Sequence, residues 1–166
     1  MNMASRTLAT LLAAAGSVVG LVAGSAAYAQ YNNEVPHNPA SCESGGPKIR
    51  VNVTGIKESR GKMRVQAYYG TKGDWLEKGR WLTRVEAPAR AGTMTFCLPV
   101  PREGTYGVAV RHDLNGNGKT DLREDGGAMS NNPSINIFNL GRPSYKKTAF
   151  SAGSGITTIS VRMKYM

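Results

Sequence analysis

Several stretches of the sequence alternate polar and apolar residues with a period of two, and this pattern constrains the fold most. The clearest lie at residues 48–54, 62–69 and 156–165, which read KIRVNVT, KMRVQAYY and ITTISVRMKY. Successive side chains of a β-strand point to opposite faces, so each stretch predicts a strand with one buried face. Residues 93–98 and 105–112 are two further strands, bounded by Gly and Pro.

The remaining segments complete an all-β pattern. Residues 144–150 look like another strand, and residues 134–140 are either irregular or a short strand. Residues 71–92 break the alternation and leave room for a single helical turn at 74–78. Almost no helix is expected, so the sequence predicts a single β-sandwich of about seven strands, either immunoglobulin-like or prealbumin-like.

The segment after the strand at 105–112 has the spacing of an EF-hand-type calcium loop. Its twelve residues, DLNGNGKTDLRE, place side-chain oxygens at loop positions 1, 3, 5, 9 and 12. Glycine stands at loop position 6. The predicted ligands are Asp113, Asn115, Asn117, Asp121, Glu124 and the backbone carbonyl of Lys119. The alternative is a tight Asn- and Gly-rich turn that needs no metal. No amphipathic helix flanks the loop, so we expect a calcium-type loop between strands rather than a helix–loop–helix hand.

The N-terminus predicts export. Residues 1–29 combine Arg6, an apolar run at 8–23 and a small-x-small site, Ala27-Tyr28-Ala29, which together are typical of a signal peptide cleaved after Ala29. An uncleaved membrane anchor is the alternative. The mature chain then has an extended arm at 30–47 and one β-domain at 48–166, and the expected location is periplasmic or secreted.

Two cysteines, Cys42 and Cys97, remain after that cleavage. An even pair in an exported protein predicts a disulfide, here one that ties the arm to the strand at 93–98. Two separate buried thiols are the alternative.

The charge suggests acidic partners without defining them. The formal net charge is +10, and loss of Arg6 with the signal peptide lowers it to +9. Anionic envelope components are therefore possible partners, although the basic residues are scattered and no nucleic-acid motif is present. Trp75 and Trp81 predict either a ligand-binding loop, for example for a sugar ring, or a packed flap.

The residues around the loop resemble a known family. Gly104-x-Tyr106-x-Val108-Ala109-Val110-x-His112-Asp113-x-Asn115-x-Asn117-Gly118-Lys119-x-Asp121 is similar to the signature of the bacterial family called domain of unknown function 2141. The resemblance implies an exported, single-domain, mostly β protein without an assigned reaction. Members usually carry a longer segment after the second aspartate, so Glu124 rests on spacing alone, and Asp125 is an alternative ligand.

No recognisable catalytic constellation accompanies these features. His112 beside Asp113 would be a general base in a hydrolase, but consecutive strand residues face opposite sides, which favours a structural histidine. The sequence therefore predicts a non-enzymatic envelope protein, a binding or structural module stabilised by calcium. A module that binds surface polysaccharide or anionic lipid is the alternative, and a hydrolase using His112 is less favoured.

Overall fold

A computed structural model describes residues 32–166, and within them the chain is all-β with ten strands in two sheets. The signal-peptide prediction for 1–29 lies outside the described residues. The strands are β1 (Asn33–Val35), β2 (Lys48–Ile56), β3 (Lys62–Tyr69), β4 (Thr83–Pro88), β5 (Gly92–Pro99), β6 (Gly104–Asp113), β7 (Gly126–Met129), β8 (Phe150–Ala152), β9 (Ile156–Arg162) and β10 (Lys164–Tyr165). The short helical elements are η1 (Pro39–Glu43), η2 (Ile137–Asn139) and α1 (Tyr145–Thr148).

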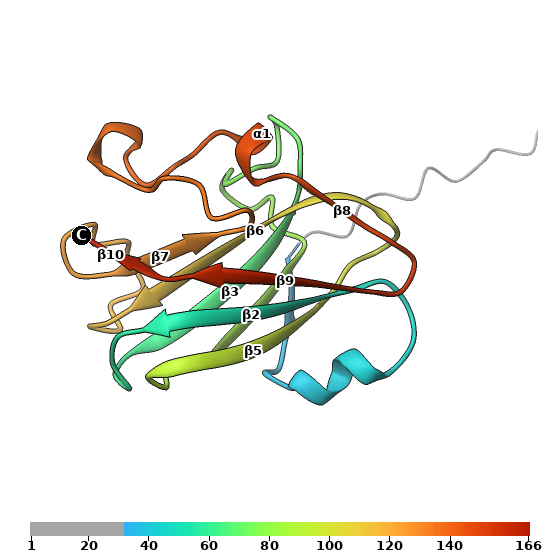
Figure 1. Cartoon of the computed structure of the whole chain (residues 1–166), viewed down its shortest axis with the longest axis horizontal. Coiled ribbons are helices and arrows are strands. Elements are labelled where there is room, and N and C mark those ends of the chain that lie inside the picture. Colours follow the sequence, from blue (N-terminus) through green and yellow to red (C-terminus); the bar gives the residue numbers. More distant parts are fainter. Residues whose placement is uncertain (1–31) are drawn as a thin grey trace, which may run out of the picture.

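The larger sheet has the order β1-β4-β3-β6-β7-β10, and β8 pairs with the opposite end of β6. The smaller sheet has the order β5-β2-β9, with β2 antiparallel to β5 and parallel to β9. Figure 1 shows these three strands lying across the larger sheet. The chain passes from one sheet to the other at Met163, because β9 belongs to the smaller sheet and β10 to the larger.

One core lies between the two sheets, and the alternation seen in the sequence builds it. The buried residues of β2 include Ile49, Val51 and Val53, and those of β3 include Met63 and Val65. Both strands contribute to the same hydrophobic cluster, which also takes in residues of β5, β6 and β9. The polar partners in each strand face outward, as a period-two pattern requires.

The outer face of the larger sheet carries a second, smaller cluster at one end. It consists of Tyr68, Trp75, Trp81 and Met129. Gly107 makes room for it, because a Cβ there would lie 2.6 Å from the ring of Trp75. The segment between β3 and β4 is thus folded down onto the sheet by aromatic packing.

The prediction of an all-β chain is confirmed, and the strands expected at 48–54, 62–69, 93–98 and 105–112 are present. The expected strand at 144–150 is wrong: Tyr145–Thr148 form one helical turn, and only Phe150 begins a strand. The turn buries Thr148, whose hydroxyl donates to the Tyr145 carbonyl (3.0 Å), a contact three residues apart that an extended strand could not make.

Contacts of several kinds attach the arm before β2 to the domain. Its strand β1 pairs in parallel with β4, and the Cys42–Cys97 disulfide, predicted from the sequence, joins η1 to β5. Lys48 reaches back to donate to the carbonyl oxygens of Ser41 (2.5 Å) and Ser44 (2.7 Å). Within the described residues no helix has the length and apolar character needed to cross a bilayer.

Candidate functional site

The predicted calcium loop connects β6 to β7, which are antiparallel neighbours with His112 opposite Gly126. Strand β6 delivers Asp113 at its last residue, and β7 starts immediately after Asp125. The loop therefore closes a hairpin, and its two ends are held together by the sheet. Sequence alternation had correctly placed a strand before the loop, but the glycines of β7 hid the strand that follows it.

Asp113 organises the first half of the loop. Its carboxylate is buried, and it accepts hydrogen bonds from the backbone N–H groups of Gly116 (2.8 Å) and Gly118 (2.9 Å). Both glycines have positive φ, 71° and 77°, which residues with a side chain rarely adopt. This is the tight coil that the glycine at the sixth position predicts.

The two asparagines bridge the halves of the loop. The Oδ1 atoms of Asn115 and Asn117 accept backbone N–H groups two residues ahead, at 3.0 and 2.7 Å. The Nδ2 of Asn115 donates to Asp121 (3.2 Å) and Glu124 (2.9 Å), and that of Asn117 donates to Asp121 (2.7 Å). Five predicted ligand side chains, from Asp113 to Glu124, are thereby linked directly or through the loop backbone.

The side-chain amides also affect the ionisation of Asp121. Hydrogen bonds from Asn117 and Asn115, followed by the charges of Lys119 and Arg111, hold the pKa of Asp121 below its usual value. A lowered folded-state pKa gives stability that is present above the unfolded-state pKa and is lost as the pH falls through the folded-state value. The carboxylate therefore stays ionised at neutral pH, as a cation ligand must.

Asp125, which the sequence left as an alternative ligand, has a different place from Glu124. Asp125 is buried and accepts the backbone N–H groups of Leu114 (3.1 Å) and Asp121 (3.0 Å). Glu124 is exposed and faces Asn115. Glu124 therefore shares the amide of Asn115 with Asp121, while Asp125 ties the two ends of the loop together.

These roles predict different costs of substitution without metal. Asp125→Ala leaves two backbone donors without their carboxylate, so we expect the free energy of unfolding to fall by about 2 kcal/mol. Glu124→Ala removes an exposed side chain and should change it by less than about 0.5 kcal/mol. Urea denaturation in EDTA measures both. Equal costs for the two variants would contradict this division of roles.

Arg111 holds the loop against the outer face of the sheet. Its guanidinium donates to Thr120 Oγ1 (3.0 Å), to the Gly118 carbonyl (3.0 Å) and, more loosely, to Asp113 Oδ2 (3.4 Å). Burial lowers the pKa of Arg111, and the charge of Arg64 lowers it further. Its Nε is the one buried side-chain nitrogen or oxygen in residues 32–166 that has no hydrogen-bond partner.

His112 lies on the other side of β6, in the core, with no exposed surface. Its Nε2 lies 2.7 Å from the Arg60 carbonyl, which only accepts, so Nε2 carries the proton. Its Nδ1 lies 2.7 Å from the hydroxyl of Tyr165, which also accepts the Lys57 N–H (3.0 Å). Both ring nitrogens are thus occupied and shielded from solvent, and His112 and Asp113 do not converge.

The two tryptophans proposed as ligand contacts are mostly buried. Trp75 and Trp81 expose 6% and 9% of their surface. Trp75 donates from Nε1 to the Pro143 carbonyl (2.8 Å), and the Arg84 guanidinium lies 4.1 Å from the ring centre of Trp81. Little ring surface remains for a sugar, so this arrangement matches the packed-flap alternative.

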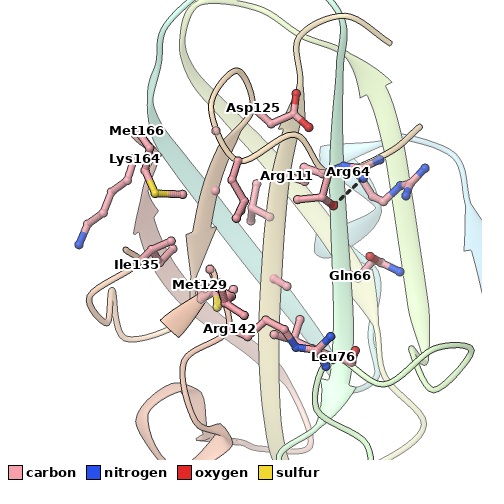
Figure 2. Close-up of a pocket in the computed structure, with 18 of the residues that line it drawn as sticks. Arg64, Gln66, Leu76, Arg111, Asp125, Met129, Ile135, Arg142, Lys164 and Met166 are labelled. Atoms are coloured by element: carbon pink, nitrogen blue, oxygen red, sulfur yellow. Dashed lines mark hydrogen bonds between the residues drawn. The ribbon is translucent and has the colours of Figure 1, made fainter. Parts of the chain in front are cut away.

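Sequence reasoning missed a groove on the outer face of the larger sheet. It has a volume of about 440 Å³ and lies between the floor formed by β3, β6 and β7 and the segment that follows β7. Figure 2 shows Arg64 and Gln66 on one side, Lys164 and Met166 on the other, and Leu76 near Arg142 at one end. The only sequence signal was that Arg64 and Arg111 occupy outward positions of adjacent alternating strands.

The donor set of the loop consists of oxygen atoms, which suits a hard cation such as calcium. It combines carboxylates with amide and backbone carbonyl oxygens. In the part of the chain that the structure describes, no three His, Cys, Asp or Glu side chains gather into a metal-binding group.

The comparison with known proteins gives one result. A family described as an uncharacterized protein conserved in bacteria matches residues 51–160, which run from within β2 to within β9 and include the whole loop. No curated protein and no solved structure shows a significant match. The chain belongs to that bacterial family, domain of unknown function 2141, as the residues of β6 and its loop had indicated.

Proposed function

We propose that this protein is an exported, non-enzymatic module of the bacterial envelope, stabilised by calcium bound in the loop from Asp113 to Glu124. The observation that carries the proposal is the convergence of Asp121 and Glu124 on the amide of Asn115. The amide NH2 groups of Asn115 and Asn117 point at these carboxylates, so partial positive charge already lies where a cation would bind. Rotation of either amide about its terminal torsion would present its oxygen instead.

Calcium would act on the loop as a structural ion. Negatively charged oxygens would come from Asp113, Asp121 and Glu124. Neutral oxygens would come from Asn115, Asn117 and the Lys119 carbonyl. The carboxylates of Asp121 and Glu124 accept amide hydrogen bonds on an exposed loop. Binding would fix both halves of the hairpin end and therefore stabilise the pairing of β6 with β7. At most three carboxylates take part, so we expect moderate to weak affinity, suited to an extracytoplasmic compartment.

The test is thermal and chemical unfolding with and without calcium. At a calcium concentration about 100-fold above the dissociation constant, the free energy of unfolding should rise by about 2.7 kcal/mol. Asp121→Asn keeps the shape of the side chain but removes its charge, and should reduce the calcium response strongly. The matched control is Asp74→Asn, which changes a carboxylate in the turn before β4 and should leave that response intact.

Two results would remove calcium from the function. One is no shift of the unfolding midpoint at millimolar calcium in the parent protein. The other is an equal shift of the midpoint with magnesium. Magnesium requires a stricter, more hydrated octahedral coordination than calcium. An equal shift would therefore indicate a general effect of divalent ions rather than binding in a calcium-type loop.

Fold type and location belong to the same proposal. We infer a β-sandwich of immunoglobulin-like or prealbumin-like type, supported by the single core between two sheets. The disulfide supports an oxidising, periplasmic or secreted location. The burial of His112 supports a non-enzymatic role over a hydrolase. Binding of surface polysaccharide or anionic lipid remains the second candidate function, supported by the basic groove rather than by Trp75 and Trp81.

A further inference from the structure

The floor of the outer groove contains a row of like charges that strand pairing brings together. Arg64 on β3 lies directly opposite Arg111 on β6. Arg111 in turn pairs with Gly127 on β7, which pairs with Lys164 on β10. Like charges opposite one another on neighbouring strands destabilise a sheet unless something compensates them.

The compensation within the protein is incomplete. Arg64 has an ion pair (2.6 Å) with Glu86 on β4, which does not line the groove, and the contact of Arg111 with Asp113 is 3.4 Å. Arg111 also has the buried, unpartnered Nε. Four cationic side chains line the groove, Arg64, Arg111, Arg142 and Lys164, and the one side-chain carboxylate among the lining residues is that of Asp125. The lining side chains therefore carry a formal net charge of +3, four cations less one carboxylate, although Glu86 and Glu77 pair with Arg64 and Arg142 from outside the lining.

Gly127 creates the hollow in this row. A Cβ at Gly127 would meet only the Cδ1 of Ile135, at 3.8 Å, so open space separates Arg111 from Lys164. Toward the end where Leu76 and Arg142 lie, most of the lining is apolar, while Arg142 itself donates to the Leu76 carbonyl and to Glu77. The apolar residues are Ala109, Met129, Ile135, Leu140 and Leu76. Leu140 is 69% exposed and Phe138, nearby in the same segment, is 92% exposed, which is unusual for large apolar side chains.

We propose that this groove binds a single-chain amphiphile with one negative charge, of the fatty-acid class. The carboxylate lies in the hollow above Gly127, between Arg111 and Lys164 and near Arg64. The acyl chain follows Ala109 and Met129 toward Leu76, under Ile135 and Leu140. The groove volume falls in the range of small-molecule sites, and a polar end joined to an apolar channel matches this ligand.

Titration calorimetry with decanoate below its micelle concentration tests the proposal, in calcium and again in EDTA. We expect one molecule per chain, with decanol and acetate each binding at least about tenfold more weakly, because each lacks one of the two contacts. Gly127→Leu fills the hollow without removing a charge and should weaken binding at least about tenfold. Lys164→Gln removes one exposed charge and should weaken it by about threefold to fivefold.

Matched variants separate the groove from general effects. Gly153→Leu places the same side chain where a Cβ meets nothing within 4 Å, outside the groove, and should bind decanoate normally. Lys78→Gln removes a charge from an exposed turn and should do the same. If Gly127→Leu does not fold, Ala109→Leu fills the floor from β6 instead.

Three outcomes would overturn the proposal. The first is the absence of decanoate binding to the parent protein. The second is equal decanoate binding by the parent, Gly127→Leu and Ala109→Leu. The third is binding of the protein to anionic vesicles but not to monomeric decanoate. The last would assign the exposed apolar segment to a membrane surface rather than the groove to a monomeric ligand. Calcium dependence is separate: loss of the calcium response with retained decanoate binding would leave this inference in place.

Discussion

Gly61→Ala is expected to lower the free energy of unfolding by about 4 kcal/mol, because a methyl group there meets backbone atoms and the backbone conformation is unfavourable. Gly61 has φ of +73°, and its Cβ would lie 1.9 Å from the carbonyl oxygen of Asp113 and 2.8 Å from that of Leu114. Neither oxygen can move without shifting the start of the loop between β6 and β7. Chemical denaturation of the purified variant measures the loss.

Gly79→Ala is the matched control. Gly79 has nearly the same φ, +74°, but no atom within 4 Å of the added Cβ. It should cost only about 1 kcal/mol, the price of the left-handed conformation alone. The difference between the two variants isolates the contact with Asp113, and equal losses would show that this contact contributes nothing.

Removal of the disulfide with Cys42→Ala/Cys97→Ala should lower the free energy of unfolding by about 4 kcal/mol, since the crosslink closes a long loop in the unfolded chain. The two cysteines are 55 residues apart in sequence and both are buried. Guanidinium denaturation of the parent in oxidising and reducing buffer should show the same difference as the double variant.

The double variant supplies its own control, because its midpoint should not respond to reductant. The variant should still fold, since β1 remains paired with β4 and Lys48 still bonds η1. A parent protein with the same stability in both buffers would contradict the prediction and would mean that these other contacts already restrain the arm.

The sequence predicted those elements whose evidence is local. Period-two alternation located β2, β3, β5 and β6, and the even cysteine pair identified the disulfide. Strand β4 carries the same alternation, with Thr83, Val85 and Ala87 buried, but it lies in a segment whose tryptophans and glycines obscured it. Strand β7 has two glycines, so it offered no side-chain pattern to read.

The candidate site, like the fold, was predictable only where its evidence is local in the sequence. Loop spacing selected residues that hydrogen bonds within the loop connect, and whether they bind a metal stays a prediction. Two adjacent carboxylates, Glu124 and Asp125, cannot be assigned from spacing alone. Their roles depend on which one faces the backbone of Leu114. The groove was not predictable, because it depends on a glycine that strand pairing places between Arg111 and Lys164.

The parallel pairing of β2 with β9 has a consequence for the order in which this chain can fold. The central strand of the smaller sheet needs neighbours from far along the sequence, as the Thr54–Val161 hydrogen bond shows, with a separation of 107 residues. A chain that emerges N-terminus first therefore cannot complete this sheet until residues 156–162 are available. Closure of such distant contacts is intrinsically slow. The topology thus keeps the domain unfinished for most of its synthesis, a state in which a polypeptide can still be threaded through a translocation channel.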